Sequence, residues 1–498
     1  MNPLLAKLHE MRDAGGAART IGLPEATVAE LGTQFPELAQ AIEEAHARFV
    51  QIRDTMADFV ALDEQAQIAA VQHDYINFYQ DDAINPYVGL AARGPWVITL
   101  KGAVLHDSGG YGMLGFGHAP QPLLDILARP QVMANVMTPS LSQLRFSAAL
   151  KAEIGRSCGG SPFSHFLCLN SGSESVSLAA RITDVNAKLM TDTGARHAGR
   201  SIKRVAVKGA FHGRTEAPAV YSDSSRKTYQ ANLASYRNES TLLTVEPYDV
   251  GQLRSVFAEA EQNGWFIEAM FLEPVMGEGD PGRAVDVEFY KAARELTKAH
   301  GSLLLVDSIQ AGLRAHGVLS IVDYPGFEGV EAPDMETYSK ALNAGQYPLS
   351  VLAVNAHAAE LYRKGIYGNT MTTNPRALDV ACGVMEMLTP EIRDNIRARG
   401  AECVAKLEAL KTELAGSITK VQGTGLLFSC ELSEDFKCFG AGSTEEWMRE
   451  HGFGVIHGGA NSLRFTPHFG ITATEVDLII DGVRKALTDG PRKSRSGA

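Results

Sequence analysis

Two residues, Asp307 and Lys340, have the types and the placement needed to hold a cofactor. Asp307 ends an apolar run at residues 303–306, and Lys340 follows Tyr338 and Ser339 at the end of a later apolar segment. An acid at one strand tip and an amine at another is the arrangement that pyridoxal phosphate requires. The acid keeps the ring nitrogen protonated, and the amine carries the aldehyde as a Schiff base. Alternatively, Asp307 caps a turn and Lys340 is a solvated lysine, and the pair alone does not decide between these interpretations.

A phosphate group could bind to the run Asn170-Ser171-Gly172-Ser173-Glu174. This run follows the apolar residues 166–169 and opens a segment with helical periodicity. Small residues at a helix N-terminus leave amide groups and the positive end of the helix dipole exposed, which makes an anion site. Ser171 and Glu174 also have the spacing of an ordinary capping box. Both interpretations remain open for the run by itself.

Gly110, Gly112 and Gly115 match the glycine spacing of a dinucleotide-binding loop, but their surroundings argue against that function. No clear parallel strand precedes them, and residues 116–120 contain a proline and no helical pattern. A dinucleotide loop lies between a strand and a helix, because the helix N-terminus binds the pyrophosphate. A nicotinamide enzyme is therefore disfavoured.

Two further segments are expected to end at the same sheet edge as Asp307 and Lys340. Phe211 and His212 follow an apolar run at 204–207, and Glu273 follows another at 269–272. A flat aromatic side chain there could stack on a planar ring, although a core phenylalanine beside a hydrogen-bonded histidine is the commoner role. Ligands of open α/β sheets bind at the carboxyl ends of the strands.

The elements that must position these residues alternate between short strands and helices from Gly109 to about Pro390. This alternation predicts an α/β fold with a mainly parallel central sheet and helices on both faces. Ahead of it, residues 93–107 read as a hairpin that turns at Lys101 and Gly102. We expect an N-terminal helical segment and hairpin over 1–100 that packs with the small domain, a large cofactor-binding domain over 101–385, and a smaller α+β domain over 386–498. The strands expected in the large domain lie at 166–169, 204–207, 242–245, 269–272, 303–306 and 350–354.

Composition narrows the class of protein. The net charge is -12, from 46 basic and 58 acidic residues without long runs of one sign, so nucleic acid and anionic membranes are not expected as partners. No apolar stretch approaches the roughly 20 residues needed to span a bilayer. The six cysteines include no C-x-x-C pair, so neither a disulfide framework nor a metal site is predicted. A reduced, cytoplasmic location fits best.

The motifs together resemble the class III aminotransferases, which are pyridoxal phosphate enzymes related to ornithine, 4-aminobutyrate and lysine ε-aminotransferases. The likeness covers about residues 90–488, with the motifs in the same order. Agreement of this kind is specific, although each motif alone is weak. The segments that carry the resemblance begin at Asn170 (N-S-G-S-E-S), Phe211 (F-H-G-R-T), Glu273 (E-P-V-M-G-E-G), Asp307 (D-S-I-Q-A-G), Ser339 (S-K-A-L-N-A-G), Thr370 (T-M-T-T-N-P) and Leu463 (L-R-F-T-P).

The resemblance implies fold type I of the pyridoxal phosphate enzymes and a role for each matched residue. Lys340 would bear the cofactor and shuttle the proton, and Asp307 would pair with the pyridinium nitrogen. The ring would lie between Phe211 and Ile309, and Gln310 would bind its hydroxyl. His212 and Ser171 belong to the same cofactor site, Gly172 and Ser173 would bind the phosphate through their amides, and Thr370 would reach the phosphate from the second subunit of a homodimer.

For the substrate, the resemblance implies that Arg464 grips a carboxylate and that Glu273 neutralises this arginine when an ω-amine occupies the site. We therefore expect an aminotransferase that moves an amino group from an amino acid or ω-amine to a 2-oxo acid by a ping-pong mechanism, with glutamate and 2-oxoglutarate as one pair. An aminomutase, a racemase or a decarboxylase could use the same scaffold, and a non-catalytic cofactor-binding protein is an alternative of another class. Ser308 stands where the family usually has a glutamate, and Met276 and His468 also depart from the family pattern. These departures leave the amino donor undetermined.

Overall fold

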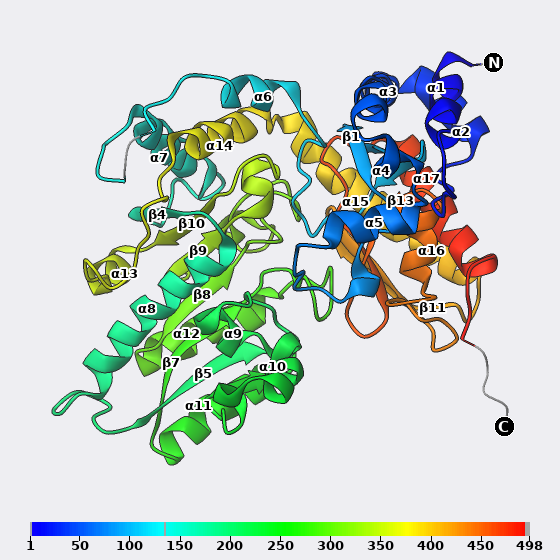
Figure 1. Ribbon diagram of the computed structural model, residues 1–498. Coiled ribbons are helices and arrows are strands. Elements are labelled where there is room, and N and C mark those ends of the chain that lie inside the picture. The colour runs from blue at the N-terminus through cyan, green and yellow to red at the C-terminus, as the bar shows by residue number, and fades with distance from the viewer. Residues whose placement is uncertain (1, 134–135, 494–498) are drawn as a thin grey trace. The chain divides into compact units, whose positions relative to one another are not determined.

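This computed structural model describes residues 2–133 and 136–493, which fall into two units (Figure 1). The first unit comprises the chain up to residue 121, residues 398–422 and the chain from 428 onward. The second comprises residues 122–397 and 423–427. Each unit therefore draws on segments that are distant in sequence.

A seven-stranded sheet forms the centre of the second unit, in the order β4-β10-β9-β8-β7-β5-β6. Neighbouring strands from β9 to β6 run parallel, whereas β10 is antiparallel to both β4 and β9. The predicted α/β fold with a mainly parallel sheet is thus confirmed, with one reversed strand. The bounds are β4 His165–Leu169, β5 Ser201–Val207, β6 Leu242–Val245, β7 Trp265–Leu272, β8 Leu303–Asp307, β9 Met335–Tyr338 and β10 Ser350–Val354.

Helices cover both faces of this sheet because its central strands are apolar on both sides. Helix α8 (Gly172–Thr191) packs on the face that carries Leu303 and Leu305. Leu304 and Val306 alternate with these residues and point to the opposite face, and all four side chains are buried. Burial on both faces is typical of parallel strands. The other helices that lie wholly in this unit are α7 Leu141–Glu153, α9 Glu216–Tyr221, α10 Arg226–Asn232, α11 Val250–Gln262, α12 Val287–His300, α13 Ala356–Leu361 and α14 Pro375–Met387, while α6 Gln121–Leu127 and α15 Pro390–Glu413 cross the boundary between the units.

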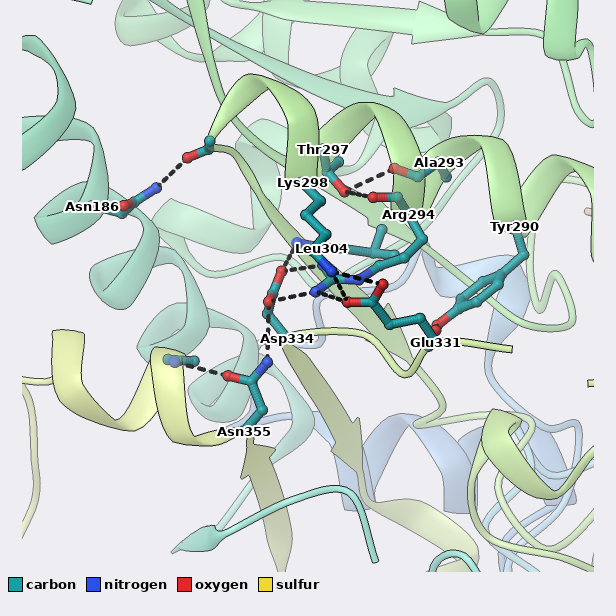
Figure 2. Close-up of polar contacts among 12 residues, drawn as sticks. Asn186, Tyr290, Ala293, Arg294, Thr297, Lys298, Leu304, Glu331, Asp334 and Asn355 are labelled. Carbon is teal, nitrogen blue, oxygen red and sulfur yellow. Dashed lines mark hydrogen bonds and ion pairs between the residues drawn. The ribbon is translucent and has the colours of Figure 1, made fainter. Parts of the chain in front are cut away.

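A polar network at the amino end of β9 anchors α12 to the sheet (Figure 2). Asp334 is buried and accepts hydrogen bonds from both terminal nitrogens of Arg294, at 2.7 and 3.1 Å. It also accepts from the backbone nitrogen of Leu304 at 2.9 Å and from the side-chain amide of Asn355 at 3.1 Å. The network connects α12, β8, β9 and the residue before α13. It lies at the opposite end of β8 and β9 from Asp307 and Lys340.

The first unit contains two four-stranded sheets, in the orders β1-β2-β3-β13 and β11-β12-β15-β14. The predicted hairpin is present as the antiparallel pair β2 and β3, in which Trp96 lies opposite His106. The strand bounds are β1 Gly89–Arg93, β2 Trp96–Thr99, β3 Val104–Asp107, β11 Ile418–Thr424, β12 Leu427–Leu432, β13 Phe453–Gly454, β14 Ile456–Gly458 and β15 Ser462–Phe465. The helices are α1 Pro3–Arg12, α2 Glu25–Gln34, α3 Pro36–Thr55, α4 Ala57–Ala61, α5 Glu64–Gln72, α16 Thr444–Glu450 and α17 Ala473–Thr488.

No helix among the described residues is both long enough and apolar enough to span a bilayer.

Candidate active site

A cavity of about 160 Å³ lies at the carboxyl edge of the seven-stranded sheet. Most of the residues predicted from sequence to bind the cofactor line it, and they come from loops that follow five different strands. Such convergence at the carboxyl edge is expected for a ligand site of an open α/β sheet. The lining residues are Ser171, Gly172, Ser173, Phe211, His212, Gly213, Glu273, Asp307, Ile309, Gln310, Ser339 and Lys340.

Asp307 is the last residue of β8, and both of its carboxylate oxygens are held. The His212 ring nitrogen Nδ1 lies 2.8 Å from Oδ2, and the backbone nitrogen of Ile309 donates to Oδ1 at 3.1 Å. The Asp307 and His212 side chains are both buried. Buried charge-assisted hydrogen bonds are strong and directional. The carboxylate therefore has a defined orientation in the cavity wall.

Lys340 begins the turn after β9 in an unusual backbone conformation. Its φ is +53°, in the left-handed region that side-chain-bearing residues rarely adopt. The Lys340 amine donates to the Gln310 side-chain oxygen at 3.2 Å. Gln310 is itself buried, and none of the described residues provides a hydrogen-bond partner for its amide nitrogen Nε2. Backbone strain of this kind concentrates at functional sites, and the unpaired amide marks a place for a ligand acceptor.

Glu273 follows β7 and places a second carboxylate beside the cavity. Its Oε1 accepts from the backbone nitrogen of Phe211 at 3.0 Å, and its Oε2 accepts from that of Gly277 at 2.9 Å. Burial, together with the negative charge of Asp307, raises the pKa of Glu273 to about 7, although His212 and the two amides act in the opposite direction. Glu273 can therefore exist in either protonation state near neutral pH.

The N-terminus of α8 has the form of an anion site. Ser171 is the N-cap and forms a reciprocal capping box with Glu174, so the amides of Gly172 and Ser173 in the first turn lack intrahelical acceptors. A side chain at Gly172 would come within 2.6 Å of the Ile309 Cδ1 atom. The capping box and the anion site are thus both possible at once, because the box uses other amides.

Two predicted site residues, Thr370 and Arg464, do not line this cavity. Thr370 is exposed, in a loop whose Asn369 donates to Glu174 at 2.7 Å. Arg464 lies on β15 in the first unit, where it is buried with its guanidinium 5.3 Å from the centre of the Tyr111 ring.

Arg214 was not assigned a role from the sequence. Its guanidinium carbon lies 4.9 Å from the centre of the Phe211 ring, close enough for a cation–π contact. Its terminal nitrogen lies 3.9 Å from Glu278. The motif that contains Phe211 and His212 also contains Arg214, so this motif could have identified Arg214 as a candidate from the sequence.

The departure at His468 has a structural role within the first unit. The Nε2 atoms of His106 and His468 lie 3.2 and 2.8 Å from the same Glu475 oxygen. The other Glu475 oxygen completes the capping box of α17 with Thr472. The two histidines therefore connect β3 and the segment after β15 to the start of that helix.

Known proteins match most of this chain in sequence. A family model described as Aminotransferase class-III matches residues 79–487. Acetylornithine aminotransferase of Xanthomonas axonopodis pv. citri is 29% identical over 376 residues, which cover 74% of this chain and 85% of that protein. The corresponding enzyme of Thermosynechococcus vestitus is 27% identical over 427 residues, covering 82% and 97%.

Solved structures of ornithine and acetylornithine aminotransferases share the fold. The ornithine aminotransferase of Toxoplasma gondii ME49 has a TM-score of 0.73 at 22% identity, covering 88% of this chain and 98% of that one. The acetylornithine aminotransferase of Elizabethkingia anophelis has a TM-score of 0.67 at 22% identity, covering 86% and 99%. The fold predicted from the motifs is confirmed.

Proposed function

The chain belongs to the class III aminotransferases, which depend on pyridoxal phosphate, and we propose that it moves an amino group from an amino acid or ω-amine to a 2-oxo acid. Glutamate and 2-oxoglutarate form one substrate pair, and the two half-reactions follow each other in a ping-pong order. The observation that carries the proposal is the convergence of Asp307, Lys340, Gln310 and the α8 N-terminus on one cavity. These groups supply what the cofactor's ring, aldehyde, hydroxyl and phosphate each require.

The lining residues fit pyridoxal phosphate. The unpaired Gln310 amide can donate to the ring hydroxyl, and the Gly172 and Ser173 amides can bind the phosphate. Phe211 and Ile309, which both line the cavity, would flank the ring, and Asp307, oriented by His212, would hold the proton on the ring nitrogen. When bound, the cofactor withdraws electrons from the substrate carbon.

Lys340 is the residue that would move the proton. Its amine would hold the aldehyde of the cofactor and, once freed by the substrate amine, could accept the proton that the substrate carbon loses. The hydrogen bond from Lys340 to Gln310 supports this role, because it directs the amine toward the wall where the ring hydroxyl would lie. The proton would return to the cofactor carbon from the same nitrogen.

Guanidinium groups would recognise the substrate carboxylates, since their planar donors match a carboxylate in a bidentate geometry. Following the family resemblance, Arg464 grips one carboxylate and Glu273 neutralises it when an ω-amine is bound. The raised pKa of Glu273, about 7, supports a residue that works in both charge states. Arg214, beside Phe211, is a second candidate for a carboxylate.

A homodimer would complete the site, with Thr370 reaching the phosphate of the other subunit. Support comes from exposed apolar side chains on α7 and on the loops near it, since such patches mark interfaces. Two of them, Val136 and Leu144, line a hollow of about 820 Å³ that also includes Asn369, the neighbour of Thr370. The exposed residues are Val136, Met137, Leu141, Leu144 and Met371. Sedimentation should therefore give twice the monomer mass of 53.6 kDa.

A cytoplasmic location is in keeping with six unpaired cysteines.

The colour of the purified protein tests the function. Protein loaded with pyridoxal phosphate should be yellow, glutamate should bleach it, and 2-oxoglutarate should restore the colour. Lys340→Ala should lack both the lysine-bound colour and turnover, whereas a variant of an exposed lysine, Lys291→Ala, should retain both. A colour that persists with every amine tested would exclude a transaminase and favour another reaction on the same scaffold.

A further inference from the structure

A third buried acid, Glu336, connects the two strands that end at the cofactor site. It lies on β9, on the strand that leads to Lys340, and its side chain is fully buried. Its Oε1 accepts from the Ser308 hydroxyl at 2.5 Å and from the backbone nitrogen of Ile321 at 2.9 Å, and its Oε2 accepts from the Ser320 hydroxyl at 2.5 Å. One carboxyl group therefore joins β9 to the end of β8 and to the loop beyond it.

Glu336 is held without a cationic partner. The described residues provide no ion pair to it, and the titratable groups that face it are the phenols of Tyr290, Tyr324 and Tyr338. Burial raises the pKa of Glu336 to about 7, while hydrogen bonds from Ser308, Ser320 and Ile321 act in the opposite direction. Burying a carboxyl group in this way is costly. A carboxyl group that is buried without a cationic partner, despite this cost in stability, suggests a functional reason for its presence.

Ser308 connects Glu336 to the candidate cofactor site. Ser308 directly follows Asp307, and its backbone nitrogen donates to the Thr337 oxygen at 3.0 Å. Its backbone oxygen accepts from Gly312 at 2.8 Å, and its hydroxyl is bound to Glu336. The residue next to the proposed ring-nitrogen acid is thus fixed on three sides, and Glu336 supplies the side-chain contact.

We propose that Glu336 is a positioning residue of the cofactor site, which fixes Ser308, and through it Asp307, relative to the strand that leads to Lys340. The carboxyl group that the family usually carries directly after the aspartate is supplied here by the neighbouring strand. The departure at Ser308 is therefore compensated by Glu336. This inference rests on the proposed function, because it assumes that Asp307 and Lys340 hold pyridoxal phosphate.

Four variants test the proposal, with purified protein and added pyridoxal phosphate: two at Glu336, one control, and one that exchanges the residues at 308 and 336. Glu336→Leu removes the carboxyl group. Glu336→Gln keeps the size and shape of the side chain, and it tests the proposal even if Glu336→Leu does not fold. Glu268→Gln is the matched control, because Glu268 is also buried in this sheet but binds Tyr221 and Arg204 instead. The readouts are the dissociation constant for pyridoxal phosphate, the pH midpoint of the visible absorbance of the lysine-bound cofactor, and the thermal midpoint of the cofactor-free protein.

We expect Glu336→Leu to weaken cofactor binding about tenfold, the effect of losing one hydrogen bond to a charged group, and to shift the absorbance midpoint. Glu336→Gln should shift the same midpoint less, and Glu268→Gln should lower only the thermal midpoint. The exchange Ser308→Glu with Glu336→Ser should return both cofactor readouts toward wild type.

The proposal is overturned if both Glu336 variants keep the wild-type affinity and absorbance midpoint, or if Glu268→Gln alters them equally. An exchange variant no closer to wild type than Glu336→Leu would refute the compensation. None of these readouts requires amine turnover, so a failed transaminase assay is distinguishable from a failed positioning role.

Discussion

The His212 ring nitrogen Nδ1 lies 2.8 Å from Oδ2 of Asp307, while the other ring nitrogen, Nε2, is buried and has no hydrogen-bond partner in the described part of the chain. His212 therefore donates through Nδ1 to the Asp307 carboxylate and orients it. Sequence reasoning placed both residues in the cofactor site but did not predict that they touch. Their contact joins the loop after β5 to the end of β8, and it makes the direction of the Asp307 carboxylate depend on a neighbour.

Replacing His212 should weaken cofactor binding without unfolding the protein. Hydrogen bonds to charged groups contribute about 1.5 to 3 kcal/mol, so His212→Leu should raise the dissociation constant for pyridoxal phosphate roughly tenfold to a hundredfold. His212→Asn can place an amide donor near the position of Nδ1 and should recover part of the loss. Absorbance titration measures both constants. Equal affinities for wild type and His212→Leu would show that the contact does not orient Asp307.

The close approach of Gly172 and Ile309 should make the phosphate end of the site intolerant of a methyl group. A Cβ at Gly172 would lie 2.6 Å from the Ile309 Cδ1 atom, and overpacking of this kind costs about 1 to 3 kcal/mol. Gly172→Ala should therefore lose roughly tenfold or more in cofactor affinity, and adding Ile309→Ala should restore part of it. Gly89→Ala is a suitable control, because its nearest neighbour would lie at 3.8 Å. Full affinity in Gly172→Ala would mean that the loop can move away.

The network around Asp334 should control stability rather than catalysis (Figure 2). Asp334→Ala leaves Arg294 without its buried carboxylate partner, and breaking a buried pair in this way costs about 3 to 5 kcal/mol. Glu331 also binds Arg294 but is half exposed. Glu331→Ala should therefore lower the free energy of unfolding by at most about 1 kcal/mol. Denaturant unfolding measures both changes. A loss of turnover in folded Asp334→Ala would contradict the separation between this end of the sheet and the active site.

Stability should fall on mild acidification because His300 is buried in an uncharged form. Burial, with the nearby His197, lowers the pKa of His300 from 6.5 to about 4, and its Nε2 accepts a hydrogen bond from the backbone nitrogen of Ile267 at 3.2 Å. Between these two pKa values the unfolded chain binds a proton that the folded chain does not, so stability is lost as the pH falls from 6.5 to 4. Thermal unfolding across this range should show the decrease, and His300→Phe should show a smaller one. A slope unchanged by the substitution would assign the effect to other groups.

The sequence by itself was enough to predict which residues meet at the candidate site. Motif order identified Asp307, Lys340, Phe211 and the α8 N-terminus, since short motifs at strand ends depend on local residue types. The alternation of apolar runs predicted the mainly parallel sheet, and the capping box at Ser171 was visible from its spacing. The strand that leads to Lys340 was expected as a short apolar segment without stated bounds, and the structure gives it as β9, whose four residues include Glu336 and Thr337.

Tertiary structure decided what could not follow from local patterns. The reversed direction of β10 depends on pairing with β4 and β9, which are distant in sequence. The contacts of Asp307 with His212 and of Ser308 with Glu336 join strands whose register only the folded sheet sets. Burial then gives Glu273 and Glu336 pKa values of about 7, because the cost of charge in an apolar interior depends on the surroundings and not on the residue type. The contact of Ser308 with Glu336 could not be predicted from the sequence, because only the folded sheet brings the Glu336 carboxyl group of β9 to the Ser308 hydroxyl.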